Sequence, residues 1–585
     1  MNYLRPFQLV LTMLGLIMAV LLWVPSISAA PENNADYFVV RLYYESMAEV
    51  QQIADGGYDI WANERSARYL VVAVNGPQYQ QLTAAGWPMT IDAERTAALE
   101  MIPDTSGRQS TFFGGYRTVD DLYSDLATLN AAHPTLTELV DYGDSYCKLQ
   151  AGCTTLGGEQ QAGYDLYAIR VTNEAISGTS TIADGVITQG SKPVFFLMAN
   201  IHSREITTPE LAMNMLDWLL DGYGQNADAT WLVDWHELWI IPTANPDGHW
   251  LVELGTKPPY NSIPFYHRKN ANRVGCDQWP PQSSYHYGVD LNRNHSFGWG
   301  GSGTSADPCS AIYRGAAAAS EPEVVALQNL ITAVIPDQRG PDLSDAAPDD
   351  TSGLFITLHS YGDLVLWPWG NTTTAAPNKA GLQAIGDHLA SFNGYTSCQP
   401  SYCLYSASGT SDDWAYGVLG VPAFTFEVGN QFMPPFSQVA GVQWPQNGPA
   451  LQYAARIARA PYTEVFGPDV VSLAVTSTSP MVTVTAVVDD IQSGNLPISA
   501  TVFAVDTPYW AGGTEMTATA VDGVFDEPQE TVAITLPTAV YGPGRQTVFI
   551  RAQDTTGYWG PTHAIFVDLT EDTTQHAYIP VVHNP

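Results

Sequence analysis

Between residues 113 and 462, short apolar runs that suit buried strands alternate with longer stretches that suit helices. The clearest strand candidates are residues 194–198, 238–241, 354–358 and 423–426. Strands that alternate with helices are typical of an α/β domain, in which helices cover both faces of a sheet. We therefore predict that residues 113–462 form one large α/β domain with a central mixed β-sheet flanked by helices.

One helix is expected directly after the first of these strands. Leu211, Met215 and Leu219 recur at the spacing that places side chains on one helical face. Thr207 and Glu210 have the spacing of a capping box, which would start the helix. The segment between the strand and the helix is therefore a loop at the carboxyl end of a strand, where ligands bind in open α/β sheets.

The chain changes character on both sides of this domain. Residues 37–95 show a β-α-β order and predict a small α+β unit, joined to the large domain by a polar linker at 96–112. Residues 468–572 show short alternating strands separated by Gly-, Pro- and Asp-rich turns, which predict an all-β immunoglobulin-like sandwich. One strand of this sandwich is expected at 515–521, and a tail follows at 573–585.

The amino terminus has the pattern of a secretory signal peptide. Arg5 precedes an almost wholly apolar run from residue 9 to residue 24, and small residues follow at Ser28 and Ala29. We predict that residues 1–30 are a signal peptide and that the mature chain is secreted, extracellular and without a membrane span. An uncleaved membrane anchor is the alternative, although the apolar run is short for a span.

Charge and cysteine content agree with an exported protein. The formal net charge of −36 disfavours binding to the phosphates of nucleic acid and to anionic membranes. Six cysteines occur as three neighbouring pairs, and we predict the disulfides 147–153, 276–309 and 398–403, although six cysteines allow other pairings. No oligomeric state is predicted.

The loop after residues 194–198 carries His202 and Glu205. Imidazole nitrogens and carboxylate oxygens are good zinc ligands, and a catalytic zinc site needs three protein ligands and an open position. His359 follows the strand candidate at 354–358 and can project into the same crevice as a third ligand. A solvated His–Glu pair and a structural core histidine are the alternatives at these positions.

Nine segments together resemble the zinc metallocarboxypeptidases of the pancreatic carboxypeptidase A/B family, in the order that this family has. They cover roughly residues 113–460 and are HSRE at 202–205, NPDG at 245–248, HRKN at 267–270, GVDLNRN at 288–294, YRG at 313–315, SEPE at 320–323, LHSYG at 358–362, SGTSDDW at 408–414 and FTFE at 424–427.

The resemblance implies that His202, Glu205 and His359 hold one Zn²⁺, which activates a water molecule and polarises the scissile carbonyl. It implies that Glu427 is the general base that takes a proton from the attacking water and passes it to the leaving amine. It also implies that Arg268 stabilises the developing oxyanion. Apart from the resemblance, a glutamate at the end of an apolar strand could be a buried structural carboxylate.

The resemblance assigns further residues to the substrate. Asn292 and Arg293 match the pair that grips the terminal carboxylate, and arginine can hold a carboxylate through two parallel hydrogen bonds. Arg204 matches a secondary substrate contact, Tyr361 a side wall of the site, and Tyr405 the mobile tyrosine that closes over the bound residue. Local packing of a loop aromatic is the alternative for Tyr405. The disulfide 276–309 also resembles a family disulfide.

Asp412 falls where the family sets the floor of the side-chain pocket. Family members with an aspartate there take Lys or Arg, because a buried carboxylate pairs with a substrate cation. We therefore expect a preference for C-terminal Lys or Arg, with tolerance of hydrophobic residues. A solvated loop acid is the alternative for Asp412.

The flanking regions carry weaker signals. Residues 37–95 lie where this family often has an inhibitory pro-segment, and Arg108 suits a processing site; a permanent N-terminal domain is the alternative. The turns at Asp489, Asp490 and Asp554 are compatible with Ca²⁺, although acidic turns are common without an ion.

Taken together, the expected function is that of a secreted zinc-dependent carboxypeptidase whose partners are peptide or protein C-termini. Two alternatives stand beside it. One is a peptidase of the same fold that acts on cell-wall stem peptides. The other is a noncatalytic secreted protein for binding or adhesion, for which the acidic surface and the sandwich would be sufficient.

Overall fold

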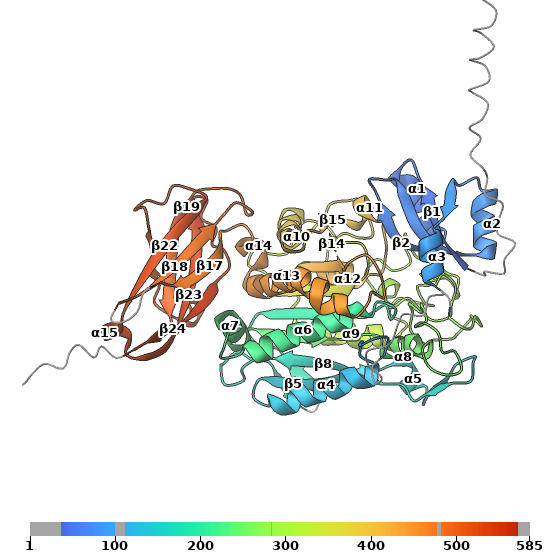
Figure 1. Ribbon diagram of the computed structural model, residues 1–585, viewed down its shortest axis with the longest axis horizontal. Helices are drawn as coiled ribbons and strands as arrows, with labels where there is room; N and C mark the ends of the chain where they lie inside the picture. Colours follow the sequence, from blue (N-terminus) through green and yellow to red (C-terminus); the bar gives the residue numbers. More distant parts are fainter. Residues whose placement is uncertain (1–36, 100–111, 184, 282, 477–480, 571–585) are drawn as a thin grey trace, which may run out of the picture. The chain divides into compact units, whose positions relative to one another are not determined.

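The computed structural model describes residues 37–99, 112–183, 185–281, 283–476 and 481–570 (Figure 1). The predicted signal peptide at 1–30, Arg108 in the linker and the tail at 573–585 lie outside these residues. No helix in the described ranges is long and apolar enough to cross a membrane.

The centre of the molecule is an eight-stranded mixed sheet in the order β15-β14-β16-β13-β11-β12-β8-β5. The four predicted strands are its middle members β11, β12, β13 and β16, which run parallel to one another. Their side chains are buried on both faces, as apolar runs of this kind require. The strands are β5 (Thr137–Asp144), β8 (Asp165–Val171), β11 (Val194–Ala199), β12 (Glu237–Ile241), β13 (Leu354–His359), β14 (Leu364–Leu366), β15 (Thr396–Cys398) and β16 (Ala423–Glu427).

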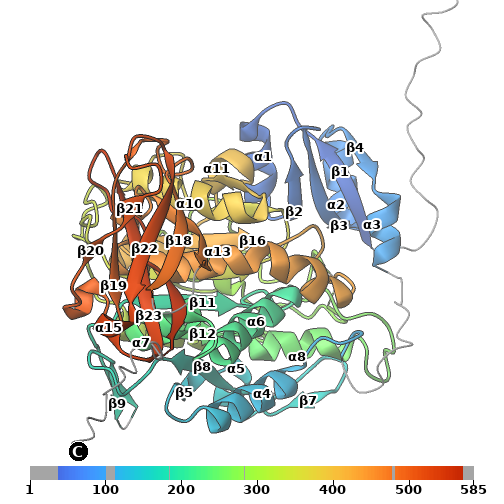
Figure 2. The same ribbon diagram turned by 60° about the vertical axis from the view of Figure 1, so that its left-hand side comes forward.

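Helices cover this sheet, and α6 lies along β11 and β12 (Figure 2). The prediction of an α/β fold with a central mixed sheet and flanking helices is therefore confirmed. The helices are α4 (Val119–Ala132), α5 (Tyr146–Leu149), α6 (Thr207–Gly222), α7 (Ala227–Trp235), α8 (Pro246–Leu254), α9 (Pro322–Val334), α10 (Lys379–Asn393), α11 (Pro400–Cys403), α12 (Ser411–Leu419), α13 (Trp444–Arg456) and α14 (Pro461–Glu464).

The predicted capping box of α6 is wrong. The cap position is Ile206, and no side chain caps the helix there. Glu210 instead accepts a hydrogen bond from the backbone N–H of Arg117 at 2.8 Å and forms an ion pair with its guanidinium. The Glu210 carboxylate therefore pairs with Arg117, which is distant in the sequence, and does not cap the start of α6.

Residues 37–98 form a four-stranded sheet in the order β2-β3-β1-β4 with three helices. The predicted β-α-β order is that of β1, α1 and β3, whereas the strands β2 and β4 went unrecognised. The elements are β1 (Tyr37–Tyr43), α1 (Met47–Asp55), β2 (Asp59–Glu64), β3 (Tyr69–Asn75), α2 (Gly76–Ala84), β4 (Met89–Ile91) and α3 (Ala93–Ala98). We call this unit the N-terminal domain.

Residues 469–569 form two four-stranded antiparallel sheets, β17-β18-β22-β21 and β20-β19-β23-β24, which share one apolar core. The single strand expected at 515–521 is two short strands that pair with different sheets, and Ala518 between them donates to Thr501 at 2.9 Å. The strands are β17 (Asp469–Val475), β18 (Met481–Asp489), β19 (Ile498–Val505), β20 (Met516–Thr517), β21 (Thr519–Ala520), β22 (Gln529–Pro537), β23 (Gly544–Asp554) and β24 (His563–Leu569).

All three predicted disulfides are present in the structure: Cys147–Cys153, Cys276–Cys309 and Cys398–Cys403. The carboxylates of the suggested calcium turns accept hydrogen bonds from backbone groups, although one oxygen of Asp490 is buried without a hydrogen-bond partner. Asp490 accepts a hydrogen bond from the N–H of Leu496, and Asp554 accepts several from the turn that follows it.

Candidate active site

The loop between β11 and α6 presents His202 and Glu205. Asn200 directly after β11 has a positive φ of 56°, which turns the chain sharply, and its side-chain amide donates to the backbone oxygens of His202 and Ser203. Thr208 closes the loop through a hydrogen bond to the oxygen of Glu205 at 2.8 Å. The loop conformation is therefore held by its own polar groups, and both predicted ligands are buried.

His359 is the last residue of β13. Strand β13 runs parallel to β11, with Leu358 opposite Ala199, so the carboxyl ends of the two strands meet at one edge of the sheet. The ring of His359 lies 4.6 Å from the ring of His202, measured between centroids. The parallel register thus joins two histidines that are 157 positions apart in the chain.

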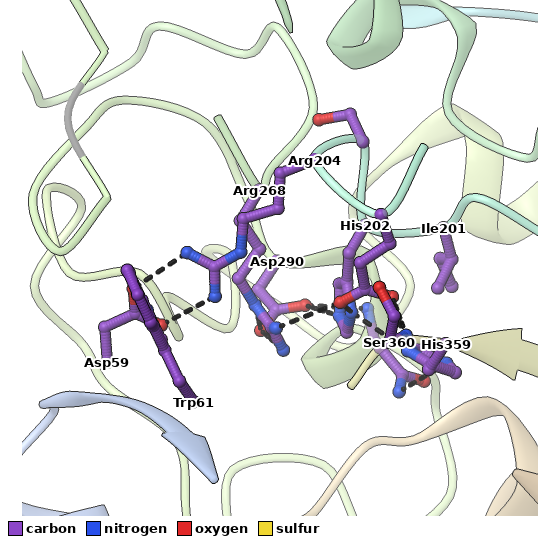
Figure 3. A network of polar contacts seen from close by, with 12 residues as sticks. Asp59, Trp61, Ile201, His202, Arg204, Arg268, Asp290, His359 and Ser360 are labelled. Atoms are coloured by element: carbon purple, nitrogen blue, oxygen red, sulfur yellow. Dashed lines mark hydrogen bonds and ion pairs between the residues drawn. The ribbon is translucent and has the colours of Figure 1, made fainter. Parts of the chain in front are cut away.

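The three predicted metal ligands lie close together, and Figure 3 shows two of them, His202 and His359, beside each other. His202 Nδ1 lies 2.9 Å from Glu205 Oε1 and 3.0 Å from His359 Nδ1, and His359 Nδ1 lies 3.2 Å from Glu205 Oε2. A tetrahedral zinc ion with ligands at about 2.0–2.1 Å places neighbouring ligand atoms roughly 3.3 Å apart. In the described residues this is the one group of three such side chains close enough to share a metal ion.

The charges at this site also fit a cation. Nδ1 of His202 and Nδ1 of His359 face each other at 3.0 Å, and a metal ion between them would accept the lone pairs of both nitrogens. Burial acts to raise the pKa of Glu205, but His202 and His359 outweigh it and lower that pKa, so the carboxylate is ionised. Burial lowers the pKa of His359, which favours the neutral ring that a metal needs.

Asp290 joins the metal ligands to the predicted oxyanion arginine (Figure 3). Its carboxylate lies 3.2 Å from Nε2 of His202 and accepts hydrogen bonds of 3.1 and 3.0 Å from the guanidinium of Arg268. A carboxylate on the second ring nitrogen fixes the orientation of a metal-ligating histidine. Asp290 lies in the segment GVDLNRN at 288–294, but no role was predicted for it.

Glu427 ends β16 directly opposite His359 in the register of the two strands. Its side chain lines the same pocket as the three ligands. Burial and the charge of Glu205 raise the pKa of Glu427 well above its ordinary value, although Arg268 acts in the opposite direction. A carboxylate with a raised pKa is a better proton acceptor and carrier near neutral pH.

Asn292 and Arg293 lie in the same pocket on a short 3-10 turn. The guanidinium of Arg293 donates to the oxygen of Gly303 at 2.8 Å and to the hydroxyl of Tyr405 at 3.2 Å. Asn292 accepts a hydrogen bond from the N–H of Ser411 at 2.9 Å. The predicted carboxylate-binding pair and the predicted closing tyrosine are thus brought together, and Tyr405 already points at Arg293.

Asp412 lies in the first turn of α12 and is 4% exposed, so it is not a solvated loop acid. Its carboxylate accepts hydrogen bonds from the hydroxyl of Thr425 at 3.1 Å and from the N–H of Asp413 at 2.9 Å. Among the described residues, no Lys, Arg or His lies within ion-pair distance of it. The pocket therefore holds a carboxylate whose partners are all neutral.

Strand β2 of the N-terminal domain borders this pocket through Ile60 and Trp61. Asp59 on β2 holds the guanidinium of Arg204 through two hydrogen bonds of 2.8 Å (Figure 3). Trp61 on the same strand stacks on Tyr266 at 5.7 Å and meets Phe432 edge-on at 5.3 Å, measured between ring centroids. Arg204, predicted to contact substrate, is therefore fully buried under β2.

The sequence profile of the zinc carboxypeptidases (Peptidase_M14) matches residues 122–443, which is more than half of the 585 residues. The chain belongs to the zinc carboxypeptidase family. The match contains His202, Glu205, His359 and Glu427, so the site described above lies within the family domain. Zn²⁺ is accordingly the metal that its His–Glu–His group is built to hold.

Curated relatives agree with this family. The chain is 27% identical over 333 residues to zinc carboxypeptidase A 1 of Drosophila melanogaster, with 55% of this chain and 64% of the relative covered. It is 27% identical over 338 residues to carboxypeptidase A1 of Bos taurus, with 56% and 66% covered. It is 26% identical over 416 residues to metallocarboxypeptidase A of Arthroderma otae, with 67% and 85% covered. The chain thus spans a little under two thirds of the Drosophila relative.

A solved structure shares the fold. The carboxypeptidase A of Helicoverpa armigera superposes with a TM-score of 0.54 at 20% sequence identity, and the match covers 72% of this chain and 97% of that one. This likeness supports the zinc carboxypeptidase fold with its central mixed sheet.

Some residues of this zinc carboxypeptidase site were missed by sequence reasoning. The sequence contained a signal for Asp290, because this residue lies two positions before Asn292 in the segment at 288–294 that resembles the family. The sequence contained no signal for Asp59 and Trp61, because the strand that carries them was not predicted. Phe432, whose ring lies 4.2 Å from the guanidinium carbon of Arg204, follows β16 in a loop without a distinctive pattern.

Proposed function

We propose that this protein is a zinc-dependent carboxypeptidase that hydrolyses the C-terminal peptide bond of peptides and proteins. The observation that carries the proposal is the meeting of His202, Glu205 and His359 in one buried group beside Glu427 and Arg293. The relatives named above support the same activity through their names.

The metal held by His202, Glu205 and His359 would supply Lewis acidity toward the scissile carbonyl and the attacking water. Glu427 then removes a proton from that water and delivers it to the leaving amine. Its raised pKa suits this double task, because the carboxyl group must both accept and release a proton near neutral pH.

Three positively charged or polar side chains would bind oxygen atoms of the substrate. Arg268, held in place by Asp290, would donate to the oxygen on which negative charge develops. Asn292 and Arg293 would bind the terminal carboxylate, and an internal peptide has no such group to offer. This arrangement would restrict cleavage to the last peptide bond.

We further propose a preference for C-terminal Lys or Arg, set by Asp412. Its buried carboxylate has only neutral partners in the described residues, so a cationic side chain in the pocket would supply the missing counter-charge. Apolar residues would still fit beside Leu366 and Leu404, which line the same pocket. Because these lining side chains are apolar, we expect the enzyme to tolerate hydrophobic C-terminal residues.

We also propose that the N-terminal domain is an inhibitory pro-segment. Asp59 neutralises Arg204, and Trp61 lies among the aromatic side chains that border the pocket. A substrate could not reach Arg204 or Phe432 while β2 remains there. Removal of the domain, at the linker that contains Arg108, would open the site.

Secretion through the predicted signal peptide completes the proposal. Three disulfides and no free cysteine in the described residues agree with an oxidising compartment. We therefore expect the protein to act outside the cell on peptides with free C-termini.

The test uses the purified full chain before and after limited proteolysis of the linker. Peptides ending in Arg and in Leu, together with muropeptides, are assayed with and without a zinc chelator. We expect the processed chain to release Arg fastest, to lose this activity to the chelator and to regain it with Zn²⁺. Hydrolysis that survives complete metal removal would refute the mechanism. Faster hydrolysis of muropeptides than of the other peptides would favour a cell-wall peptidase. The absence of any hydrolysis would favour a noncatalytic binding protein.

A further inference from the structure

The segment from Cys398 to Ala407 forms one wall of the pocket. Cys398 ends β15 and Cys403 ends α11, and a disulfide joins the two residues. Four residues of this segment line the pocket: Pro400, Leu404, Tyr405 and Ala407. The disulfide therefore lies at the base of a wall that the substrate side chain would touch.

The disulfide packs against two of the pocket's apolar residues. Cys398, Cys403 and Leu366 form a small buried cluster, with Leu404 packed against it. Leu366 also lies opposite Cys398 in the parallel pairing of β14 with β15. Since Leu366 and Leu404 both line the pocket, the disulfide packs behind two of its apolar lining residues.

The next part of the wall is held by the N-terminal domain. The oxygen of Leu404 accepts a hydrogen bond of 3.2 Å from Asn63. The backbone N–H and oxygen of Ser406 bond to the side-chain amide of Gln51 at 2.8 and 3.2 Å. Removal of the N-terminal domain, as proposed above, would withdraw these three hydrogen bonds.

After removal of the N-terminal domain, the segment from Cys398 to Ala407 would be held by contacts within the large domain. The N–H of Ala407 donates to the oxygen of Gly370 at 3.0 Å, which fixes one end. Cys403 fixes the other end, two positions before Tyr405. A tether of two residues reaches at most roughly 7 Å, so the disulfide would keep the Tyr405 ring close to Arg293.

We propose that the Cys398–Cys403 disulfide is a positioning element of the active site. It holds the apolar wall of the side-chain pocket and the segment that carries Tyr405 once the N-terminal domain has left. This inference rests on the proposed carboxypeptidase function and deepens it. The disulfide does not contact the reacting atoms, so it acts through Leu366, Leu404 and Tyr405.

The experiment compares two double variants, each expressed as the full chain and processed like the wild type. C398A/C403A removes the proposed positioning disulfide. C147A/C153A is the matched control, because it opens a loop of similar length whose cysteines pack in a different apolar cluster. For each protein, kcat and KM are measured on peptides ending in Arg and in Leu, and thermal unfolding is recorded.

For C398A/C403A we expect kcat/KM on the Arg peptide to fall about 10- to 100-fold relative to the control, mainly through a higher KM. The Arg-to-Leu ratio should move toward one, because the pocket loses its shape. A general loss of stability would lower the amount of active enzyme without changing this ratio. Equal KM values and equal ratios in the two variants would overturn the proposal.

A second measurement applies if C398A/C403A does not fold. The processed wild type is partly reduced and alkylated, and mass spectrometry identifies which disulfide has opened. Activity should decline in step with opening of Cys398–Cys403, and a decline that follows Cys147–Cys153 instead would overturn the proposal. A wild type that hydrolyses neither peptide would refute the carboxypeptidase function itself, which is a different result.

Discussion

Glu427 and Asp412 line the same pocket, yet the groups around them differ. Glu427 lies among charges, with Glu205 and Arg268 acting on it in opposite directions. Asp412 is buried and bonded to a hydroxyl and a backbone N–H, both of which are neutral. These surroundings agree with the roles proposed above, proton transfer for Glu427 and binding of a substrate cation for Asp412.

Changing Glu427 to Gln tests the first of these roles. The amide keeps the shape of the side chain but cannot accept the proton of the attacking water. We expect kcat to fall by about 10²- to 10⁴-fold or more, with Zn²⁺ still bound. Turnover is measured on an Arg peptide and metal content by elemental analysis, and near-normal turnover at full zinc content would show that another group is the base.

Changing Asp412 to Ile tests the second role. Loss of the carboxylate should lower kcat/KM for a C-terminal Arg peptide by about 100-fold and raise it for Leu. Asp413→Asn is the matched control, because Asp413 is a buried neighbour that accepts hydrogen bonds from the N–H groups of Gly370 and Asn371. The control should lose stability without a change of preference. If Asp412→Ile leaves the preference unaltered, selectivity resides elsewhere.

At the scale of elements, the active site depends on how strands are ordered and registered. Strands β11, β13 and β16 are parallel neighbours, so their last residues and the loop after β11 meet at one edge. A shift by one residue would turn His359 and Glu427 to the opposite face of the sheet. A further strand, β2, contributes Asp59 and Trp61 from the N-terminal domain.

Asp59→Asn tests the inhibitory role of β2. The variant weakens a buried ion pair with Arg204, and breaking such a pair typically costs about 3–5 kcal/mol. We expect the unprocessed chain to gain at least about tenfold in peptidase activity, whereas the processed enzyme stays unchanged because β2 is gone. Glu45→Gln is the control, since Glu45 forms an exposed ion pair with Arg68 in the same domain. Unchanged activity in unprocessed Asp59→Asn would argue against this inhibitory contact.

At the scale of the whole molecule, polar contacts join the two-sheet C-terminal part to the large domain. Asp228 on α7 accepts a hydrogen bond from the N–H of Ala564 at 2.8 Å and lies 3.3 Å from His563. His388 on α10 lies 2.7 Å from Asp469, the first residue of β17. These contacts are buried or nearly so, and their energies therefore contribute to the stability of the junction.

The pKa of Asp228 predicts how this junction responds to acid. Burial acts to raise that pKa, but His563 and Arg456 outweigh it and lower the pKa to about 2. A carboxyl group with a lowered pKa stabilises the folded state above its unfolded pKa of about 4, and this stabilisation disappears as the pH falls toward 2. The shift corresponds to about 2 kcal/mol at neutral pH.

Asp228→Asn should therefore lower the thermal unfolding midpoint at pH 7 by a few degrees, and the difference from wild type should narrow between pH 4 and pH 2. Asp221→Asn, at an exposed position of α6, is the control and should leave the midpoint unchanged at each pH. Calorimetry at several pH values makes the comparison. A difference that stays constant down to pH 2 would contradict this explanation.

Much of this molecule follows from patterns that are local in the sequence. Apolar runs of four or five residues predicted the central parallel strands, because such runs are buried in an α/β sheet. His202 and His359 follow two of these runs, which predicted a position at the carboxyl edge of the sheet for both residues. Pairing the cysteines in sequence order predicted all three disulfides, and two of these close short loops, with sequence separations of 6 and 5, at little loss of chain entropy.

Other features were decided only by tertiary contacts. Asp59 meets Arg204 across 145 positions, and Glu210 is engaged by Arg117 rather than by its own helix start. The 515–521 segment splits between two sheets because the strands that flank it lie in different layers. Local spacing in the sequence indicates only which side chains lie near one another along the chain. These ion pairs form between distant segments, because a buried charge must be neutralised by an opposite charge and packing of the domains brings the two together.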